Sequence, residues 1–265
     1  MTRTIVRTVI IVLLASLALP VMAATEIIPC VPGNKWEYDS YKIIHGTLAI
    51  DGHAVATMQD ESSGSSVYEV LSQESGSSPV IYNYREVTDL KSISGSTQHE
   101  SSNLKISNTP QGLLIHSSDN ESSDESQAEK ESYDPPLLYF SKSASSGKSW
   151  DVGMMRSGDI KSPVSAKVAG KETVTVPAGT FKDCLKVVYT TEEITGTIEM
   201  MGQKFNITSG RRRGIYWVAD GIGVVKELEV VTSGAQAPGP SGKPVMMDTS
   251  FCTVSELRPG YVVKK

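Results

Sequence analysis

Side chains that could do chemistry are few and widely spaced in this sequence. The four histidines are scattered, at His45, His53, His99 and His116. They lack the paired spacing that places two imidazoles on one zinc ion. Gly147-Lys-Ser resembles the end of a phosphate-binding loop, but Lys142 stands where its first glycine should be. No Gly-x-Ser-x-Gly elbow is present for a serine nucleophile. We therefore predict no catalytic residues, no metal site and no cofactor, and expect that the protein is not an enzyme.

Sulfur side chains offer a second kind of chemistry. Three methionine pairs are present, at Met154-Met155, Met200-Met201 and Met246-Met247. Clustered thioethers suit Cu(I). Neighbouring strand residues point to opposite faces, however, so each pair would offer one sulfur to any one surface. Packing of irregular core space is the favoured interpretation.

Three cysteines allow at most one internal disulfide. Cys30 lies near the start of the mature chain and Cys252 near its end, so a Cys30–Cys252 bond would staple both termini to the sheet. Cys184–Cys252 is the alternative. A redox enzyme is not expected, because no Cys-x-x-Cys motif occurs.

The N-terminus predicts export. Arg3 and Arg7 precede an apolar run over 9–21, and Ala23 supplies the small residue that signal peptidase requires. The apolar run is shorter than the roughly 20 residues needed to span a bilayer. We expect a signal peptide over 1–23, a periplasmic or extracellular mature chain over 24–265, and no transmembrane anchor after cleavage. Cys30 lies too far beyond the apolar run for a lipoprotein.

The charge of the mature chain disfavours nucleic acid as a partner. The whole sequence has 25 basic and 30 acidic residues. Loss of Arg3 and Arg7 leaves 23 basic residues, so the net charge becomes −7. Nucleic-acid binding depends on Lys and Arg that neutralise phosphates. The basic run 211–213 is interpreted as a solvated strand or loop edge.

Tight turns predict antiparallel strands. Asp51-Gly52 separates two strand-like runs and is typical of a two-residue hairpin with positive φ at both positions. The sequence 219–222 repeats the Asp-Gly pair. Pro177-Ala-Gly179 predicts a three-residue loop in which Gly179 takes a left-handed conformation. Strands joined this closely must pair antiparallel.

Alternation indicates which face of the sheet is buried. Phe181, Leu185, Val187 and Tyr189 share one parity, and Cys184 falls on the more polar parity. We predict a mainly β protein: one domain with a strongly curved antiparallel sheet, or half-open barrel, of about ten strands and at most one short helix. The Ser-rich acidic stretch 117–132 and the Gly/Pro-rich segment 232–244 are expected to be flexible.

Four motifs together resemble a group of exported bacterial proteins. They are Pro32-x-x-x-Trp36-x-Tyr38, Gly147-Lys-Ser-Trp150, Val176-Pro-Ala-Gly-Thr-Phe181 and Asp220-Gly-Ile-Gly-Val-Val-Lys226. In this order they resemble the TapB-type and related families of unknown function. Such families are similar in shape to periplasmic lipoprotein carriers, whose half-barrel covers an apolar cavity. The resemblance implies a fold and transfers no catalytic residues.

The leading functional hypothesis is therefore a binding module. Its concave apolar face would hold a lipid-like or other apolar small molecule, or an envelope protein partner. The candidate ligand-binding residues are Trp36, Tyr38, Trp150, Tyr216 and Trp217. The alternative is a structural or protein-interaction component of the cell envelope without a small-molecule ligand.

Overall fold

Antiparallel strands make up almost all of the chain that the computed structural model describes, residues 27–122, 129–200, 203–239 and 242–264. Within these ranges there is no helix, and so none that is long and apolar enough to cross a membrane. The predicted signal peptide at 1–23 lies outside them. The strands are β1 (Lys35–Ile50), β2 (His53–Gln73), β3 (Tyr82–Ser92), β4 (Thr97–Asn108), β5 (Gly112–Ser122), β6 (Glu129–Ser141), β7 (Ser149–Ser157), β8 (Ile160–Val176), β9 (Gly179–Thr191), β10 (Thr197–Met200), β11 (Gln203–Ala219), β12 (Gly223–Pro238) and β13 (Pro244–Leu257).

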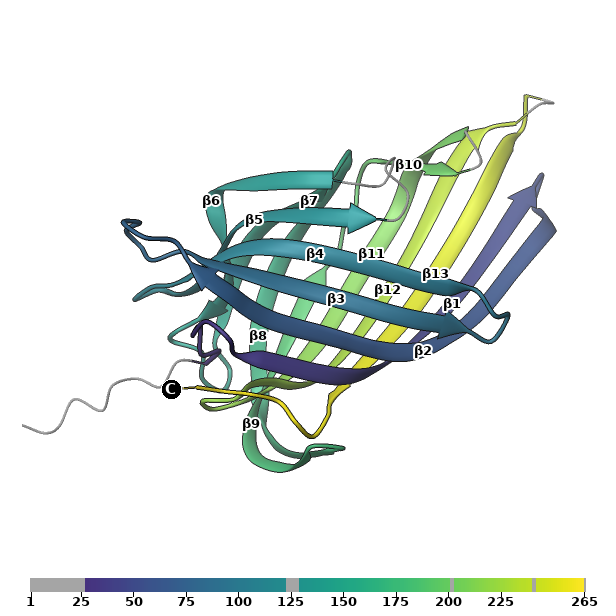
Figure 1. Cartoon of the computed structure of the whole chain (residues 1–265). Helices are drawn as coiled ribbons and strands as arrows, with labels where there is room; N and C mark the ends of the chain where they lie inside the picture. The colour runs from purple at the N-terminus through teal and green to yellow at the C-terminus, as the bar shows by residue number, and fades with distance from the viewer. Residues whose placement is uncertain (1–26, 123–128, 201–202, 240–241, 265) are drawn as a thin grey trace, which may run out of the picture.

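The strands form one sheet that curls around on itself (Figure 1). Its order is β6-β5-β4-β3-β2-β1-β13-β12-β11-β9-β8-β7, with β10 paired to β11 alone. The first and last strands meet, because β1 pairs with β13 from Tyr38 opposite Leu257 to Ile50 opposite Val245. The predicted fold class is confirmed, although the sheet has 13 strands where about ten were expected.

The sheet ends at β6 and β7, which face each other without a backbone ladder between them in the described ranges. Side chains cross this seam. The Trp150 indole on β7 donates to the Leu138 carbonyl on β6 at 3.0 Å. The Tyr189 hydroxyl on β9 donates to the Tyr139 carbonyl on β6 at 2.6 Å. The barrel is therefore nearly closed, and its closing contacts come from side chains.

Two segments that were predicted to be flexible contain strands. Residues 117–122 belong to β5 and pair with β6, with Ser117 opposite Ser132; residues 123–128 are not described. Residues 232–238 belong to β12 and pair with β13. Polar composition did not prevent strand formation, because each segment continues a ladder whose backbone hydrogen bonds do not depend on side chains. These additional strand residues lengthen the walls of the barrel.

The turns follow the sequence pattern in part. Asp51 and Gly52 have φ values of 54° and 77° between the paired residues Ile50 and His53, as predicted. The loop before β9 is shorter than predicted. Val176 pairs directly with Gly179, so only two residues connect the strands, and Gly179 has φ 132°.

One face of β9 also differs from simple alternation. Val187 and Tyr189 are buried as expected, but Cys184, predicted on the polar face, is fully buried as well. It follows an irregularity at Asp183, which has φ 57° beside a register shift in the β8–β9 ladder. Such a bulge places an extra residue in one strand and locally disturbs the alternation of its side chains.

Two contiguous apolar clusters fill one end of the barrel. One contains Phe140, Val168 and Tyr216, and the other contains Trp36, Val70 and Leu257. A smaller cluster around Phe205 and Met247 packs at the far ends of β11–β13. The interior opens beside these clusters, where some of their residues, such as Trp36 and Tyr216, share the wall with polar side chains.

Candidate functional site

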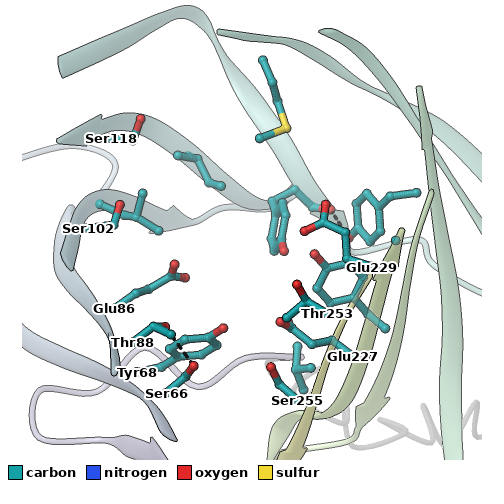
Figure 2. A pocket seen from close by; sticks show the side chains of 18 of the residues that line it. Ser66, Tyr68, Glu86, Thr88, Ser102, Ser118, Glu227, Glu229, Thr253 and Ser255 are labelled. Carbon is teal, nitrogen blue, oxygen red and sulfur yellow. Dashed lines mark hydrogen bonds between the residues drawn. The ribbon is translucent and has the colours of Figure 1, made fainter. Parts of the chain in front are cut away.

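A cavity of about 550 Å³ lies inside the barrel, lined by alternate residues of nearly every strand. This volume falls within the range typical of small-molecule sites. Figure 2 shows Glu86, Thr88 and Ser102 on one side of the open space, with Glu227 and Glu229 on the other. The wall combines apolar residues, tyrosines, hydroxyls and charges.

Aromatic rings from β1, β2 and β3 form one wall of the cavity. Trp36 and Tyr38 are almost completely buried and anchored at the start of β12. The Trp36 indole donates to the Ile222 carbonyl, just before the strand, at 2.7 Å, and the Tyr38 hydroxyl donates to the Val224 carbonyl, within it, at 2.8 Å. The Tyr68 ring lies 4.8 Å from that of Tyr38 and 6.2 Å from that of Tyr84, measured between centroids. These contacts hold the ring faces in fixed positions.

A second aromatic group lies across the cavity, on β6, β9 and β11. The rings of Tyr139 and Tyr189 stack with centroids 5.4 Å apart, and Tyr216 packs edge-on against Tyr189 at 5.0 Å. All three line the cavity. Burial raises the pKa of each of these phenols, so they stay neutral at physiological pH.

Two carboxyl groups project into the cavity from opposite walls, Glu86 from β3 and Glu227 from β12 (Figure 2). Burial raises the pKa of Glu86 to about 7. The pKa of Glu227 rises to about 8, mainly through burial and then through the negative charges of Glu86 and Glu229. The exposed part of these two side chains faces the cavity. They are therefore remote from bulk solvent, although they are not tightly packed.

An ion pair lies beside them. Arg212 on β11 binds Glu229 on β12, and both line the cavity. The interpretation of 211–213 as a solvated edge is therefore wrong for its middle residue: Arg211 and Arg213 are exposed, but alternation turns Arg212 inward. Thr191 stands opposite Arg212 in the β9–β11 ladder. Its hydroxyl is buried at the cavity wall and has no hydrogen-bond partner among the described residues.

Hydroxyl groups line the cavity near Glu227. Ser40 contacts Ser66 at 2.8 Å and Ser255 at 3.2 Å, and Ser66 contacts Thr88 at 2.8 Å. This row of hydroxyls crosses four adjacent strands, β13, β1, β2 and β3. Ser255 also hydrogen-bonds Glu227. The hydroxyls fix the Glu227 side chain in the wall.

The structure brings together three of the five candidate binding residues. Trp36, Tyr38 and Tyr216 line the cavity. Trp150 lies at the seam between β6 and β7 and is not part of the lining. Trp217 faces outward: its indole donates to Glu172 at 2.7 Å, and Lys186 lies over its ring at 5.4 Å from the centroid.

The expected Cys30–Cys252 disulfide is not formed, since Cys184 and Cys252 carry free thiols. Cys252 pairs with Ile43, five residues along β13 from the Tyr38–Leu257 pair at the packed end. It alternates with the cavity-lining residues Phe251 and Thr253 and thus points outward. Cys30 is buried in the interior cluster. The two thiols therefore lie on opposite faces of the sheet, which no disulfide could bridge.

Sequence reasoning missed both cavity glutamates. Glutamate in a strand is ordinarily read as a solvent-facing residue. One signal was present: Tyr84, Glu86 and Thr88 share a parity, and so do Glu227 and Glu229. Extending the parity of Tyr84 along its strand would have turned Glu86 inward, whereas the strand of Glu227 has no aromatic residue to indicate its inner face.

No group of three or more His, Cys, Asp or Glu side chains in the described ranges is arranged to hold a metal ion. The side chains of the cavity instead offer hydrogen bonds, negative charge and aromatic faces.

Comparisons with known proteins give a limited match. A family model described as DUF3108-like matches residues 148–230, from β7 into β12. No curated protein matches the chain. Among solved structures, the chain is similar to a "putative lipoprotein" from Parabacteroides distasonis ATCC 8503, at 18% identity and a TM-score of 0.33, with 88% of this chain and 99% of that chain covered.

Proposed function

We propose that this protein is an exported, non-catalytic binding module that holds one amphipathic small molecule inside the barrel. The observation that carries the proposal is the unfilled space of about 550 Å³ between two tyrosine-lined walls. Protein interiors are normally packed to near-crystalline density. A barrel wide enough to leave such a space has room for a ligand.

The lining supports an amphipathic ligand in particular. Leu104, Ile106 and Leu137 give part of the wall an apolar surface, whereas Glu86, Glu227 and the Ser40–Ser66 row give another part hydrogen-bonding groups. A wholly apolar ligand would exclude water from the two buried carboxyl groups, Glu86 and Glu227, without offering them a hydrogen bond. A molecule with an apolar body and a polar head satisfies both regions.

Export rests on the N-terminal sequence, in which Arg3 and Arg7 precede the apolar run and Ala23. The more specific assignment to the TapB-type proteins belongs to the same proposal. It rests on the order of the four sequence motifs, two of which lie within the 148–230 match.

The test is titration with N-phenyl-1-naphthylamine, an uncharged dye that fluoresces in apolar surroundings. We expect saturable binding at one site. Thr253→Trp fills the cavity from β13 and should abolish the fluorescence gain. Thr57→Trp, at an exposed position of β2 outside the cavity, is the matched control and should bind normally. Non-saturable fluorescence, equal in both variants, would favour a structural or interaction role.

A further inference from the structure

The charged side chains of the cavity wall are not all balanced. Lys42 lies 3.7 Å from Glu100, and Arg212 binds Glu229. The remaining cation of the lining, Arg156, is exposed to solvent. Glu86 and Glu227 form no ion pair within the described residues. The interior therefore carries two carboxyl groups that face each other across open space without an ion pair of their own (Figure 2). Arg212 is paired with Glu229, and its positive charge is the last and weakest of the influences on the pKa of Glu227.

Aromatic faces adjoin these carboxyl groups. Burial and, next, the charges of Glu227 and Glu86 raise the pKa of the Tyr68 phenol, which therefore lies within electrostatic reach of both. Its ring packs against Tyr38 and close to Tyr84. The negative face of an aromatic ring attracts a cation, and ammonium ligands are commonly bound by such rings together with carboxylates.

An unused hydroxyl supplies an independent indication of a polar guest. Thr191 is 2% exposed and lines the cavity, and its Oγ1 has no partner among the described residues. A buried hydroxyl group without a hydrogen bond destabilises the protein. A hydrogen bond to a polar ligand atom would remove this cost. It lies next to Arg212, on the same inner surface as the two free carboxyl groups.

We propose that the cavity binds an amphipathic amine, with its ammonium group between Glu86 and Glu227 and its apolar body against the tyrosines and Leu137. This inference rests on the proposed function and adds the chemical class of the ligand. Where Glu86 and Glu227 are ionised, a carboxylate head group would meet like charges at the same place. An alcohol would gain hydrogen bonds but no charge pairing.

The proton balance of binding follows from this arrangement. A ligand with one ammonium group is neutralised by one ionised carboxylate, while the other carboxyl group keeps its proton. A diamine requires both carboxylates. Since burial raises the pKa of Glu86 to about 7 and that of Glu227 to about 8, binding an ammonium group below pH 7 must release a proton.

Affinity for an amine should accordingly rise with pH between 6 and 8.5. A simple alkylamine stays protonated over this range, because amines of the lysine type have pKa values near 10.4. The other groups that face the two carboxyl groups do not titrate there. They are the phenols of Tyr38, Tyr68, Tyr84 and Tyr139, whose pKa values burial raises, the hydroxyls of Thr88 and Ser255, and the guanidinium of Arg212, which is paired with Glu229.

The experiment displaces bound N-phenyl-1-naphthylamine with dodecylamine, dodecanol or dodecanoate, all three of equal chain length. We expect dodecylamine at pH 8 to compete at concentrations at least tenfold below those of dodecanol, since a hydrogen bond to a charged group contributes about 1.5–3 kcal/mol. Dodecanoate should be the weakest competitor. The tenfold advantage of the amine should shrink at pH 6.

Isosteric variants locate the effect. Glu86→Gln and Glu227→Gln should each reduce the amine advantage several-fold, and the double variant should abolish it while still binding dodecanol. Glu69→Gln removes the same charge from the outer face of β2, next to Tyr68, and controls for attraction to an acidic protein. Its competition curves should match those of the unchanged protein.

The outcomes separate the two proposals. Dye binding in which the amine and the alcohol compete equally would overturn the amine assignment and leave the binding module intact. An amine advantage that survives the double Gln variant would also overturn it. Absence of saturable dye binding would overturn both. Should the variants fail to fold, the pH dependence of dodecylamine competition in the unchanged protein decides the question.

Discussion

At the scale of single residues, Glu86 and Glu227 dominate the electrostatics of the interior. Burial favours the neutral form of both carboxyl groups, and the neighbouring strands hold both side chains in the cavity wall. Groups of this kind stabilise a fold less than an apolar side chain would. Their presence in the cavity wall is better explained by what they contact than by the stability of the barrel.

The stability of the protein should therefore fall as the pH rises from about 4.5 to about 8. A glutamate in the unfolded chain loses its proton near pH 4.3, whereas these two hold theirs until about 7 and 8. Folding thus takes up protons in this window, and the free energy of unfolding decreases with pH. A tenfold change in an ionisation constant corresponds to about 1.4 kcal/mol, so the loss should be on the order of a few kcal/mol.

Urea unfolding at pH 5 and pH 9 measures this difference. Glu227→Gln should flatten the pH dependence, because its amide does not titrate, and Glu69→Gln should leave it unchanged. Equal slopes in all three proteins would mean that the Glu227 carboxyl group ionises in the folded state as easily as in the unfolded chain.

At the scale of elements, glycines at strand ends determine how closely the strands approach. Gly112 begins β5 with φ 143°, and a Cβ there would lie 1.9 Å from the Phe140 carbonyl oxygen on β6. Gly179 begins β9 with φ 132°, but nothing lies within 4 Å of its added Cβ. The backbone strain of a side chain is similar at the two sites, while the steric clash occurs at only one.

Alanine at these positions should separate the two effects. We expect Gly179→Ala to cost about 1–2 kcal/mol from the unfavourable φ alone. Gly112→Ala should cost at least about 3 kcal/mol, because a clash with a fixed backbone oxygen is added. Equilibrium urea melts compare the variants directly. Equal losses would show that the β5–β6 approach relaxes around the added methyl group.

The sequence predicts these elements best where the structure depends on residues that are close together in the chain. Turn residues such as Asp51-Gly52 specify local backbone conformation, so the hairpins and the antiparallel class could be predicted. The inward position of Arg212 and the bulge at Asp183 depend on register between strands, which local composition does not encode. The acidic Ser-rich stretch 117–132 was predicted to be a flexible loop, because its polar composition does not indicate the strand that residues 117–122 form with β6. The inward position of Trp36 and Tyr38 could be predicted, because aromatic residues lie inward far more often than glutamates do.

At the scale of the whole molecule, the barrel is a continuous sheet except at the β6–β7 seam. Side-chain contacts hold the two strands at the seam together, whereas backbone hydrogen bonds hold neighbouring strands together elsewhere in the sheet. The Trp150 indole is one such contact, because its N–H is bound to the Leu138 carbonyl and its ring packs edge-on against Tyr189 at 6.3 Å. Trp217, by contrast, lies on the outer surface.

Trp150→Phe should loosen the seam while preserving most of the aromatic packing. Loss of the hydrogen bond should cost about 1–2 kcal/mol, since the Leu138 carbonyl is left without its donor. Hydrogen exchange should quicken in peptides from β6 and β7 and remain slow in β12 and β13. Trp217→Phe removes an indole hydrogen bond on the outer surface and is the matched control. Equal acceleration by both variants would argue that Trp150 has no special role at the seam.

The incomplete ladder between β6 and β7 also has a mechanical consequence. In a fully closed barrel, strand number and stagger fix the circumference, so the bore has one size. In this barrel a few side-chain contacts close the ring of strands between β6 and β7, so the packing of those side chains sets the circumference. The wall can therefore widen at the β6–β7 seam without breaking the hydrogen bonds of a backbone ladder. This seam runs alongside Tyr139, which lines the cavity.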